Sequence, residues 1–180
     1  MKSLDADIYL RKITDISPDY FEENNINAIL IDLDNTIVDP RVDVPSDSIQ
    51  AWLEELKEKQ IQVCFISNRF NKDEEEKLTE ILNAKVIVRA CKPLKKGFVE
   101  AVEHFGIPKE TICLIGDQTF TDVLGGNLMG FHTIKVDPLN EEKEDGFLSS
   151  FCRSLEKWYL NEKDYKSSVP IKTLQKKLTK

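Results

Sequence analysis

Short apolar runs alternate with amphipathic stretches over most of the chain. Five of the runs are four to six residues long, which is typical of buried strands rather than helices. They lie at 28–33, 61–66, 85–88, 112–115 and 133–136. The first run carries one Asp in otherwise apolar sequence, as expected of a strand that is covered on both faces in a parallel sheet.

The segments between these runs carry apolar residues at helical spacing. Helices are predicted to begin at Ser17-Pro18 and Pro45-Ser46, and to cover 71–82, 95–104 and 123–130. Strands that alternate with helices predict a doubly wound, Rossmann-like α/β fold with a five-stranded parallel sheet. The gaps after the first two strands have room for about one helix each, so no cap domain is expected.

The rest of the chain divides around this α/β unit. Residues 1–26 are expected to form a lead-in helix, 27–160 the main domain, and 161–180 a basic tail. Within the main domain, apolar residues of 147–159 repeat at i, i+3, i+4 and i+7. This spacing predicts a C-terminal amphipathic helix that packs on the core.

Composition and charge narrow the class of protein. Apolar residues make up 41% of the 180 residues and charged residues 32%, which is typical of a globular domain. No secretory signal or membrane-spanning run is recognised, so a cytoplasmic location is expected. The net charge of −7 argues against nucleic-acid binding. The tail is basic, which leaves two readings: a solvated tail, or a peripheral contact with an anionic membrane.

Polar residues follow four successive strands. Asp32 and Asp34 end the first, Ser67-Asn68-Arg69 follow the second, and Lys92 follows the third. Asp117 follows the fourth strand, and Asp122 comes five residues later. Because the carboxyl ends of parallel strands meet at one edge of the sheet, these side chains are expected to form one site.

The residue types in this set suit phosphoryl transfer. A carboxylate such as Asp32 can attack phosphorus and form an acyl phosphate. Asp34, two residues on, can give a proton to the leaving oxygen and later take one from water. A Mg²⁺ ion held by Asp32 and Asp117 offsets the repulsion among carboxylates and phosphate. Lys92 balances the remaining negative charge.

Four segments resemble, in order, the motifs of the haloacid dehalogenase superfamily of phosphatases. They are IDLDNT (31–36), ISN (66–68), KP (92–93) and IGDQTFTD (115–122). The resemblance implies that Asp32 is the nucleophile and a metal ligand, and that Asp34 is the acid/base and offers its backbone carbonyl to Mg²⁺. It also implies a phosphate site made of Ser67, Asn68 and Lys92, and a further metal ligand, Asp117.

Three more residues are expected to support the site. Asp122 is expected to reach the metal through water or to orient Lys92, and Thr36 to support the site residues from behind or to contact the leaving group. The LDNT and GDQxxTD motifs and the expected lack of a cap domain are most similar to the YqeG-type branch of subfamily IIIA. That branch is related to phosphatidylglycerophosphate phosphatases. Arg69 stands where Asn is usual in that branch and is expected to contact the leaving group.

Other functions remain open from the sequence alone. The substrate is a lipid head group or, alternatively, a soluble phosphometabolite or phosphoprotein. A receiver-type module that carries phospho-aspartate is a third reading, against which the acid at Asp34 argues. A non-catalytic partner-binding domain is a fourth. Oligomerisation, with a second subunit over the open site, is also left open.

Overall fold

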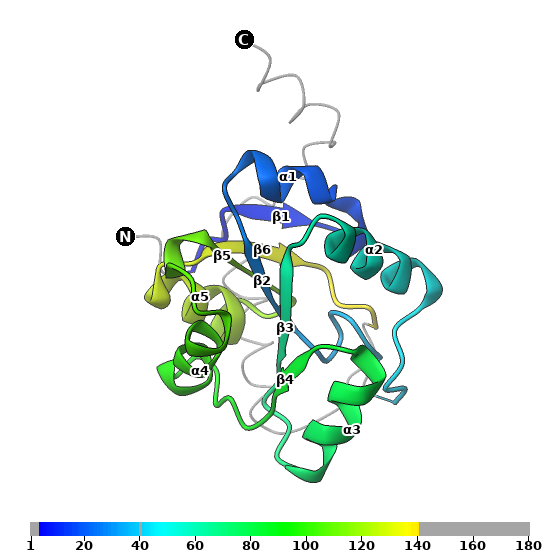
Figure 1. Cartoon of the computed structure of the whole chain (residues 1–180). Helices are drawn as coiled ribbons and strands as arrows, with labels where there is room; N and C mark the ends of the chain where they lie inside the picture. The colour runs from blue at the N-terminus through cyan, green and yellow to red at the C-terminus, as the bar shows by residue number, and fades with distance from the viewer. Residues whose placement is uncertain (1–3, 40, 141–180) are drawn as a thin grey trace.

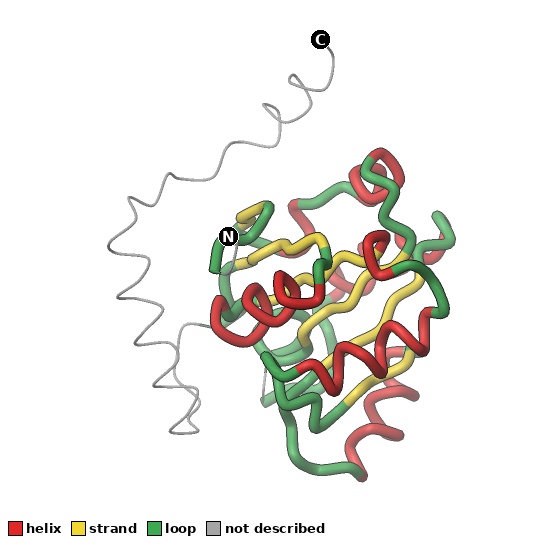
Figure 2. The backbone as a smooth tube through the Cα atoms, turned by 90° about the vertical axis from the view of Figure 1, so that its left-hand side faces the viewer, coloured by secondary structure: helices red, strands yellow, loops and turns green. Residues whose placement is uncertain are grey.

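The computed structural model describes residues 4–39 and 41–140. Six strands form one parallel sheet in the order β1-β6-β5-β2-β3-β4, with helices on both faces (Figures 1 and 2). The strands are β1 Ile8–Leu10, β2 Ala28–Asp32, β3 Gln62–Ile66, β4 Lys85–Ile87, β5 Ile112–Gly116 and β6 His132–Val136. The predicted doubly wound α/β fold is therefore confirmed.

Five α-helices flank the sheet in the described part of the chain. One face packs against α1 (Pro18–Glu23), α2 (Asp47–Glu58) and α3 (Asp73–Leu82), and the other against α4 (Lys95–Phe105) and α5 (Leu124–Met129). A π-helical turn, Thr119–Val123, leads into α5. Short 3-10 turns at Ile13–Asp15 and Lys109–Thr111 complete the elements.

The central strand β2 shows why its sequence is apolar throughout. Ile29 and Ile31 belong to the core beneath α1–α3, whereas Ala28 and Leu30 belong to the core beneath α4 and α5. Because successive side chains of a strand point to opposite faces, a strand that is covered on both sides has no solvent-facing position. All five residues of β2 are buried.

The sheet has six strands rather than the five that the sequence predicts. The missed strand is β1, which pairs with β6 through Ile8 opposite Ile134. Only three residues long and flanked by charged residues, β1 has no apolar run that would reveal it. Its place is fixed instead by a partner far along the chain: the backbone amide of Thr133 donates to Asp7 Oδ2 at 3.0 Å.

Several helix ends follow their predicted signals. Ser17 caps α1, where its hydroxyl accepts a hydrogen bond from the Asp19 amide at 3.3 Å. Gly106 ends α4 in the left-handed conformation, with φ +64°, which glycine adopts without steric cost. The Asn71 side chain, one residue before the N-cap Lys72, accepts from the Asp73 amide at 3.1 Å and so binds the first amide of α3.

The strand order creates a switch point at β2 and β5. The chain moves outward from β2 to β3 and β4, then returns to the opposite side of β2 to form β5. Connections from these two neighbours run to opposite faces, which opens a crevice at their carboxyl ends. Only α2 lies between β2 and β3, and only α3 lies between β3 and β4. The described residues therefore contain no cap domain after β2 or β3.

Two predicted regions lie outside the described residues: the amphipathic helix at 147–159 and the basic tail at 161–180. Within the part that is described, no helix is long and apolar enough to cross a membrane.

Candidate active site

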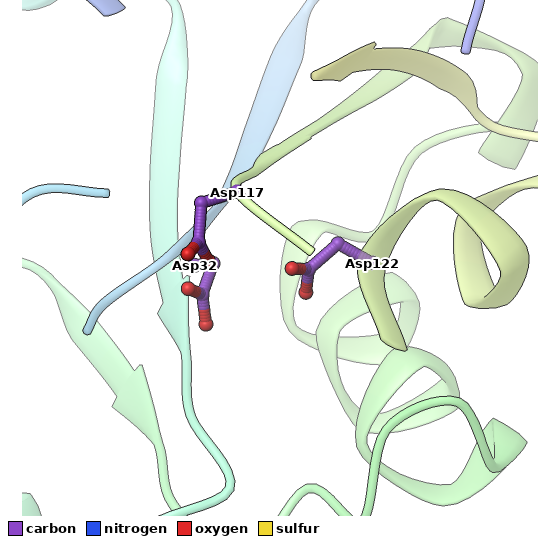
Figure 3. A group of neighbouring side chains, drawn as sticks. All are labelled: Asp32, Asp117 and Asp122. Carbon is purple, nitrogen blue, oxygen red and sulfur yellow. The ribbon is translucent and has the colours of Figure 1, made fainter. Parts of the chain in front are cut away.

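Three aspartates meet at the switch point. Asp32 is the last residue of β2, Asp117 directly follows β5, and Asp122 lies in the π-helical turn. One carboxylate oxygen from each lies within 4.8 Å of the others, and all three residues are buried (Figure 3). A buried group of oxygen ligands at this spacing suits a hard divalent cation.

A glycine before Asp117 makes room for the third carboxylate. A Cβ atom built on Gly116 would lie 2.4 Å from Cγ of Asp122, so no larger residue fits there without moving that side chain. The Gln118 amide donates to Asp122 Oδ2 at 3.1 Å and fixes the carboxylate from the other side. The local sequence therefore places Asp122 against the end of β5.

Lys92 supplies the positive charge inside this acidic group. Its ammonium donates to Oδ1 of Asp32 and, at 2.7 Å, to Oδ1 of Asp122, and its side chain is only 4% exposed. Burial raises the pKa of Asp32 well above its usual value; Lys92 opposes the shift, and Asp122 and Asp117 add to it. One ammonium against three carboxylates leaves an excess of negative charge that a bound cation would offset.

Burial also acts on Lys92 itself. It lowers the pKa of the ammonium, but the attraction of Asp122 and Asp32 outweighs it, so the net pKa lies above the usual value. Lys92 is therefore charged throughout the physiological range.

Asp34 has a different set of partners from Asp32. The Ser67 hydroxyl donates to Asp34 Oδ2 at 3.0 Å, and Arg69 donates to Oδ1 from Nη2 at 2.7 Å and from Nε at 3.0 Å. Its side chain is 30% exposed, so it faces the mouth of the site. Of the two aspartates of the DxD segment, Asp32 is thus buried and Asp34 is partly exposed to solvent.

Arg69 lies at the centre of an ion-pair network at the mouth. Besides Asp34, it contacts Asp43 at 2.8 Å and Glu74 at 3.5 Å, and Lys77 binds the same Asp43 at 2.9 Å. Burial lowers the pKa of the guanidinium, but Asp34 and Asp43 more than compensate and raise it. The structure shows Arg69 bound to the side chain of Asp34, while its contact with the leaving group stays a prediction.

Asn68 and Thr36 contact two of the predicted site residues, Lys92 and Asp32. Asn68 Oδ1 accepts from the Lys92 amide at 2.7 Å, and its Nδ2 donates to the Lys92 carbonyl at 3.3 Å. Asn68 thus fixes the backbone that carries Lys92. The Thr36 hydroxyl donates to Asp32 Oδ2 at 3.3 Å, so it lies beside the expected nucleophile.

Lys135 is a buried charge that the sequence reading missed. It is 7% exposed, and its ammonium donates to the Asp117 backbone carbonyl at 2.9 Å. The available signal was a lysine inside the apolar run of β6. Lysine is almost never fully buried unless it is paired, so such a position indicates a charged or carbonyl partner.

The fold and these contacts define a class of enzyme. A parallel sheet with Asp32 at its central strand end, an acid two residues on, a buried lysine and a later aspartate matches the haloacid dehalogenase type of phosphatase, as the four sequence motifs predicted. Residues 4–140 match the family described as mitochondrial PGP phosphatase, and the chain belongs to this family.

Individual relatives agree with this assignment. The chain is 39% identical over 156 residues to "Probable phosphatase YqeG" of Bacillus subtilis, a match that covers 86% of this chain and 88% of that protein. It is 33% identical over 88 residues to "Phosphatidylglycerophosphate phosphatase 1, chloroplastic/mitochondrial" of Arabidopsis thaliana, over 47% of this chain and 25% of that protein. The resemblance to phosphatases of the YqeG-type branch and the expected enzyme class are confirmed.

A solved structure shares the fold. A crystal structure of an uncharacterized protein from Listeria monocytogenes superposes with a TM-score of 0.53 at 19% identity, over 67% of this chain and 85% of that one.

Proposed function

We propose that this phosphatase uses Mg²⁺ and an aspartyl-phosphate on Asp32 to hydrolyse a phosphate monoester, and that its substrate is phosphatidylglycerophosphate. The observation that supports the chemistry most directly is the buried group of three carboxylates with Lys92 among them at the switch point of the sheet. Buried charges are costly unless they are paired, and an excess of one sign at such a point indicates a functional site.

The donor set fits Mg²⁺. Asp32 and Asp117 would hold the ion through carboxylate oxygens and Asp34 through its backbone carbonyl, with Asp122 close enough to contribute. The ion would neutralise negative charge on the phosphate and its carboxylate neighbours. A cation is also what the acidic excess around Lys92 requires.

In the first step, an oxygen of Asp32 attacks the phosphorus atom. A bond forms between this oxygen and phosphorus, and the bond from phosphorus to the ester oxygen breaks. Asp34 gives a proton to the departing alcohol oxygen. Lys92 and Ser67 bind phosphate oxygens, and Thr36 holds the other oxygen of Asp32 in place.

In the second step, water attacks the phosphorus of the aspartyl-phosphate. Asp34, now a carboxylate, takes a proton from this water, and the carboxylate of Asp32 is restored as phosphate leaves. Arg69 holds the side chain of Asp34 in place through hydrogen bonds to both of its carboxylate oxygens. We therefore assign Arg69 a positioning role on the acid/base, and contact with an anionic leaving group as its second role.

The substrate assignment rests on the family and on the open site. The matching family and the Arabidopsis relative both carry the name of a phosphatase for phosphatidylglycerophosphate. The described residues contain no cap domain after β2 or β3, and a site without a cap suits a phosphate that is displayed on a surface. A receiver-type role is disfavoured by the family, and a soluble substrate is the remaining alternative.

Phosphate release from phosphatidylglycerophosphate in mixed micelles tests the proposal, with an aryl phosphate measured beside it. We expect the lipid to be turned over much faster, only with Mg²⁺. Asp32→Asn should reduce release by at least about a thousandfold, because a neutral amide cannot form the acyl phosphate. Asp47→Asn, an exposed aspartate at the start of α2, is the matched control and should stay within twofold of the native rate.

Each other outcome has a definite meaning. If only the aryl ester is cleaved, the chemistry stands and the lipid assignment is wrong. If native protein and Asp32→Asn are equally inactive on both compounds, the proposed activity is wrong. Acid-stable labelling of Asp32 in the native protein but not in the variant would identify the intermediate directly.

A further inference from the structure

Exposed apolar side chains gather around the mouth of the site. Eight large apolar side chains are exposed among the described residues, and five of them come from loops at the carboxyl edge of the sheet. We call these five the apolar rim: Val42, Val44, Phe70, Leu94 and Leu139. Phe70 is 81% exposed and Leu94 66%. Scattered single apolar residues are ordinary on a surface, but a group around one site indicates a partner.

The first part of the rim is attached to the Arg69 network. Val42 and Val44 flank Asp43, whose Oδ1 lies 2.8 Å from Nη1 of Arg69. Phe70 directly follows Arg69 in the chain. These three apolar side chains are thus held next to the group that binds the acid/base.

The second part of the rim is attached to the other side of the site. Leu94 lies two residues after Lys92, the buried ammonium beside Asp32. The amide of Leu139 donates to the carbonyl of Asn35 at 2.7 Å, which places it on the loop that follows the nucleophile. Together the two parts surround the entrance from four loops.

On three of the four loops of the rim the exposed charges are cationic, whereas the loop of Leu139 carries an exposed acid, Asp137, and α3 begins with the exposed Asp73. The chain carries a net charge of −7, yet every exposed charged residue within 41–45, 67–72 and 88–96 is cationic. They are Arg41, Lys72, Arg89, Lys95 and Lys96. Of these, Arg41 is paired with Asp39 at 2.8 Å. The acid within these ranges, Asp43, is half-buried and bound by Arg69 and Lys77.

We propose that the apolar rim inserts into an anionic lipid surface, so that the site receives a phosphate ester that stays in the plane of the membrane. A lipid surface supplies apolar depth, negative charge and the substrate's phosphate together, which matches all three features of the mouth. The identity of the substrate rests on the proposed function, whereas the docking rests on the rim and its cations. The surface is therefore a second determinant of substrate choice, beside the site itself.

Binding of the full chain to vesicles tests the docking. The probes are phosphatidylcholine vesicles with and without phosphatidylglycerol, and the measurement is co-sedimentation. Phe70→Ser/Leu94→Ser should weaken partitioning to the anionic vesicles by about tenfold or more, because two apolar side chains no longer leave water. The matched control, Val99→Ser/Leu128→Ser, changes two exposed apolar residues outside the rim and should stay within twofold. Native protein should bind more weakly when phosphatidylglycerol is omitted.

A fluorescent reporter tests insertion independently of affinity. Phe70→Trp should shift its emission to the blue on anionic vesicles and be quenched by brominated lipid, whereas Leu128→Trp should do neither. Thermal melts of all variants check that they are folded.

Three results would overturn the proposal. They are native protein that does not bind anionic vesicles, a rim variant that binds as well as the control variant, and a rim that mediates self-association in sedimentation without vesicle binding. Failure of the phosphatase proposal is separate, because it appears as the absence of phosphate release while vesicle binding persists.

Discussion

The two edges of the sheet differ in how deeply their polar groups are buried. At the carboxyl edge, Asp32, Lys92, Asp117 and Asp122 are all buried, and they face one another. The amino edge instead carries a half-buried set in which the Tyr20 hydroxyl lies 2.9 Å from Nε2 of His132. Burying charge costs folding free energy, so the carboxyl edge is explained by ligand chemistry rather than by stability.

Polar contacts at the amino edge hold the fold together. Tyr20 lies in α1 and His132 opens β6, so their contact ties the first helix to the sheet. Asp7, just before β1, accepts from the Thr133 amide and joins the edge strand to β6. We therefore expect substitutions at the amino edge to lower the free energy of unfolding without changing catalysis. At some carboxyl-edge positions, a substitution should raise the free energy of unfolding instead.

The largest loss of stability is expected from the core beneath the amino-edge contacts. Phe21 is fully buried and packs edge-on against Trp52, with ring centroids 6.4 Å apart. Phe21→Ala should lower the free energy of unfolding by about 4 kcal/mol because it leaves a cavity. Urea unfolding measures the loss. The rate of phosphate release per folded molecule should be unchanged, and a rate loss of tenfold or more would contradict the separation of the two edges.

Removal of the buried ammonium should affect both properties. Lys92→Met keeps the length of the side chain but leaves Asp32 and Asp122 without their shared cation. We expect the unfolding free energy to fall by about 3 kcal/mol. Phosphate release should fall by about a thousandfold, since we propose that this cation also binds phosphate. Lys57→Met, an exposed lysine in α2, is the control. A native rate of phosphate release in Lys92→Met would show that Lys92 takes no part in catalysis.

A stabilising substitution would show that the carboxyl edge is under strain. Asp117→Asn removes one of three like charges that lie within 4.8 Å of one another. In buffer with chelator, the unfolding free energy should rise by about 1 kcal/mol, while phosphate release with Mg²⁺ should fall by at least about a hundredfold. If the variant is less stable than native protein without metal, Asp117 has a structural role and the comparison fails at this position.

The sequence predicts the central part of this molecule better than its edges. The strands at 28–33 and 112–115 and the acids that follow them come directly from continuous apolar runs with polar ends, so the parallel sheet and the meeting of Asp32 with Asp117 could be predicted. β1 could not, because three residues carry no period and the strand depends on pairing with β6. Local pattern identifies elements that are buried on both faces, but not those that a distant partner fixes.

The sequence predicts which site residues lie at the strand ends, but not which contacts their side chains make. Arg69, which pairs with Asp34, also binds Asp43, which lies on a loop of irregular backbone 26 residues earlier in the chain. No periodicity places such a loop, so these partners of Arg69 could not be predicted from the sequence. The same holds for Asn68, whose contacts with the Lys92 backbone arise only where two loops meet.

The smallest effect is expected at the amino edge, from the hydroxyl of Tyr20. Burial raises the pKa of Tyr20 from 10.0 to about 12, with Cys113 and Asp7 adding to the shift. The folded protein therefore keeps this proton to a higher pH than the unfolded chain does. The contribution of the group to stability is complete below about pH 10 and is lost as the pH rises to about 12.

Tyr20→Phe removes the hydroxyl and its contact with His132. At pH 7 it should lower the unfolding free energy by about 1 kcal/mol, the usual net value of one hydrogen bond. The gap between native protein and variant should then narrow as the pH rises through the range in which Tyr20 ionises, because only native protein loses stability when a buried hydroxyl ionises. Urea unfolding at neutral and alkaline pH measures both values. A gap that stays constant, or a variant with reduced phosphate release, would mean that the amino edge is coupled to the site.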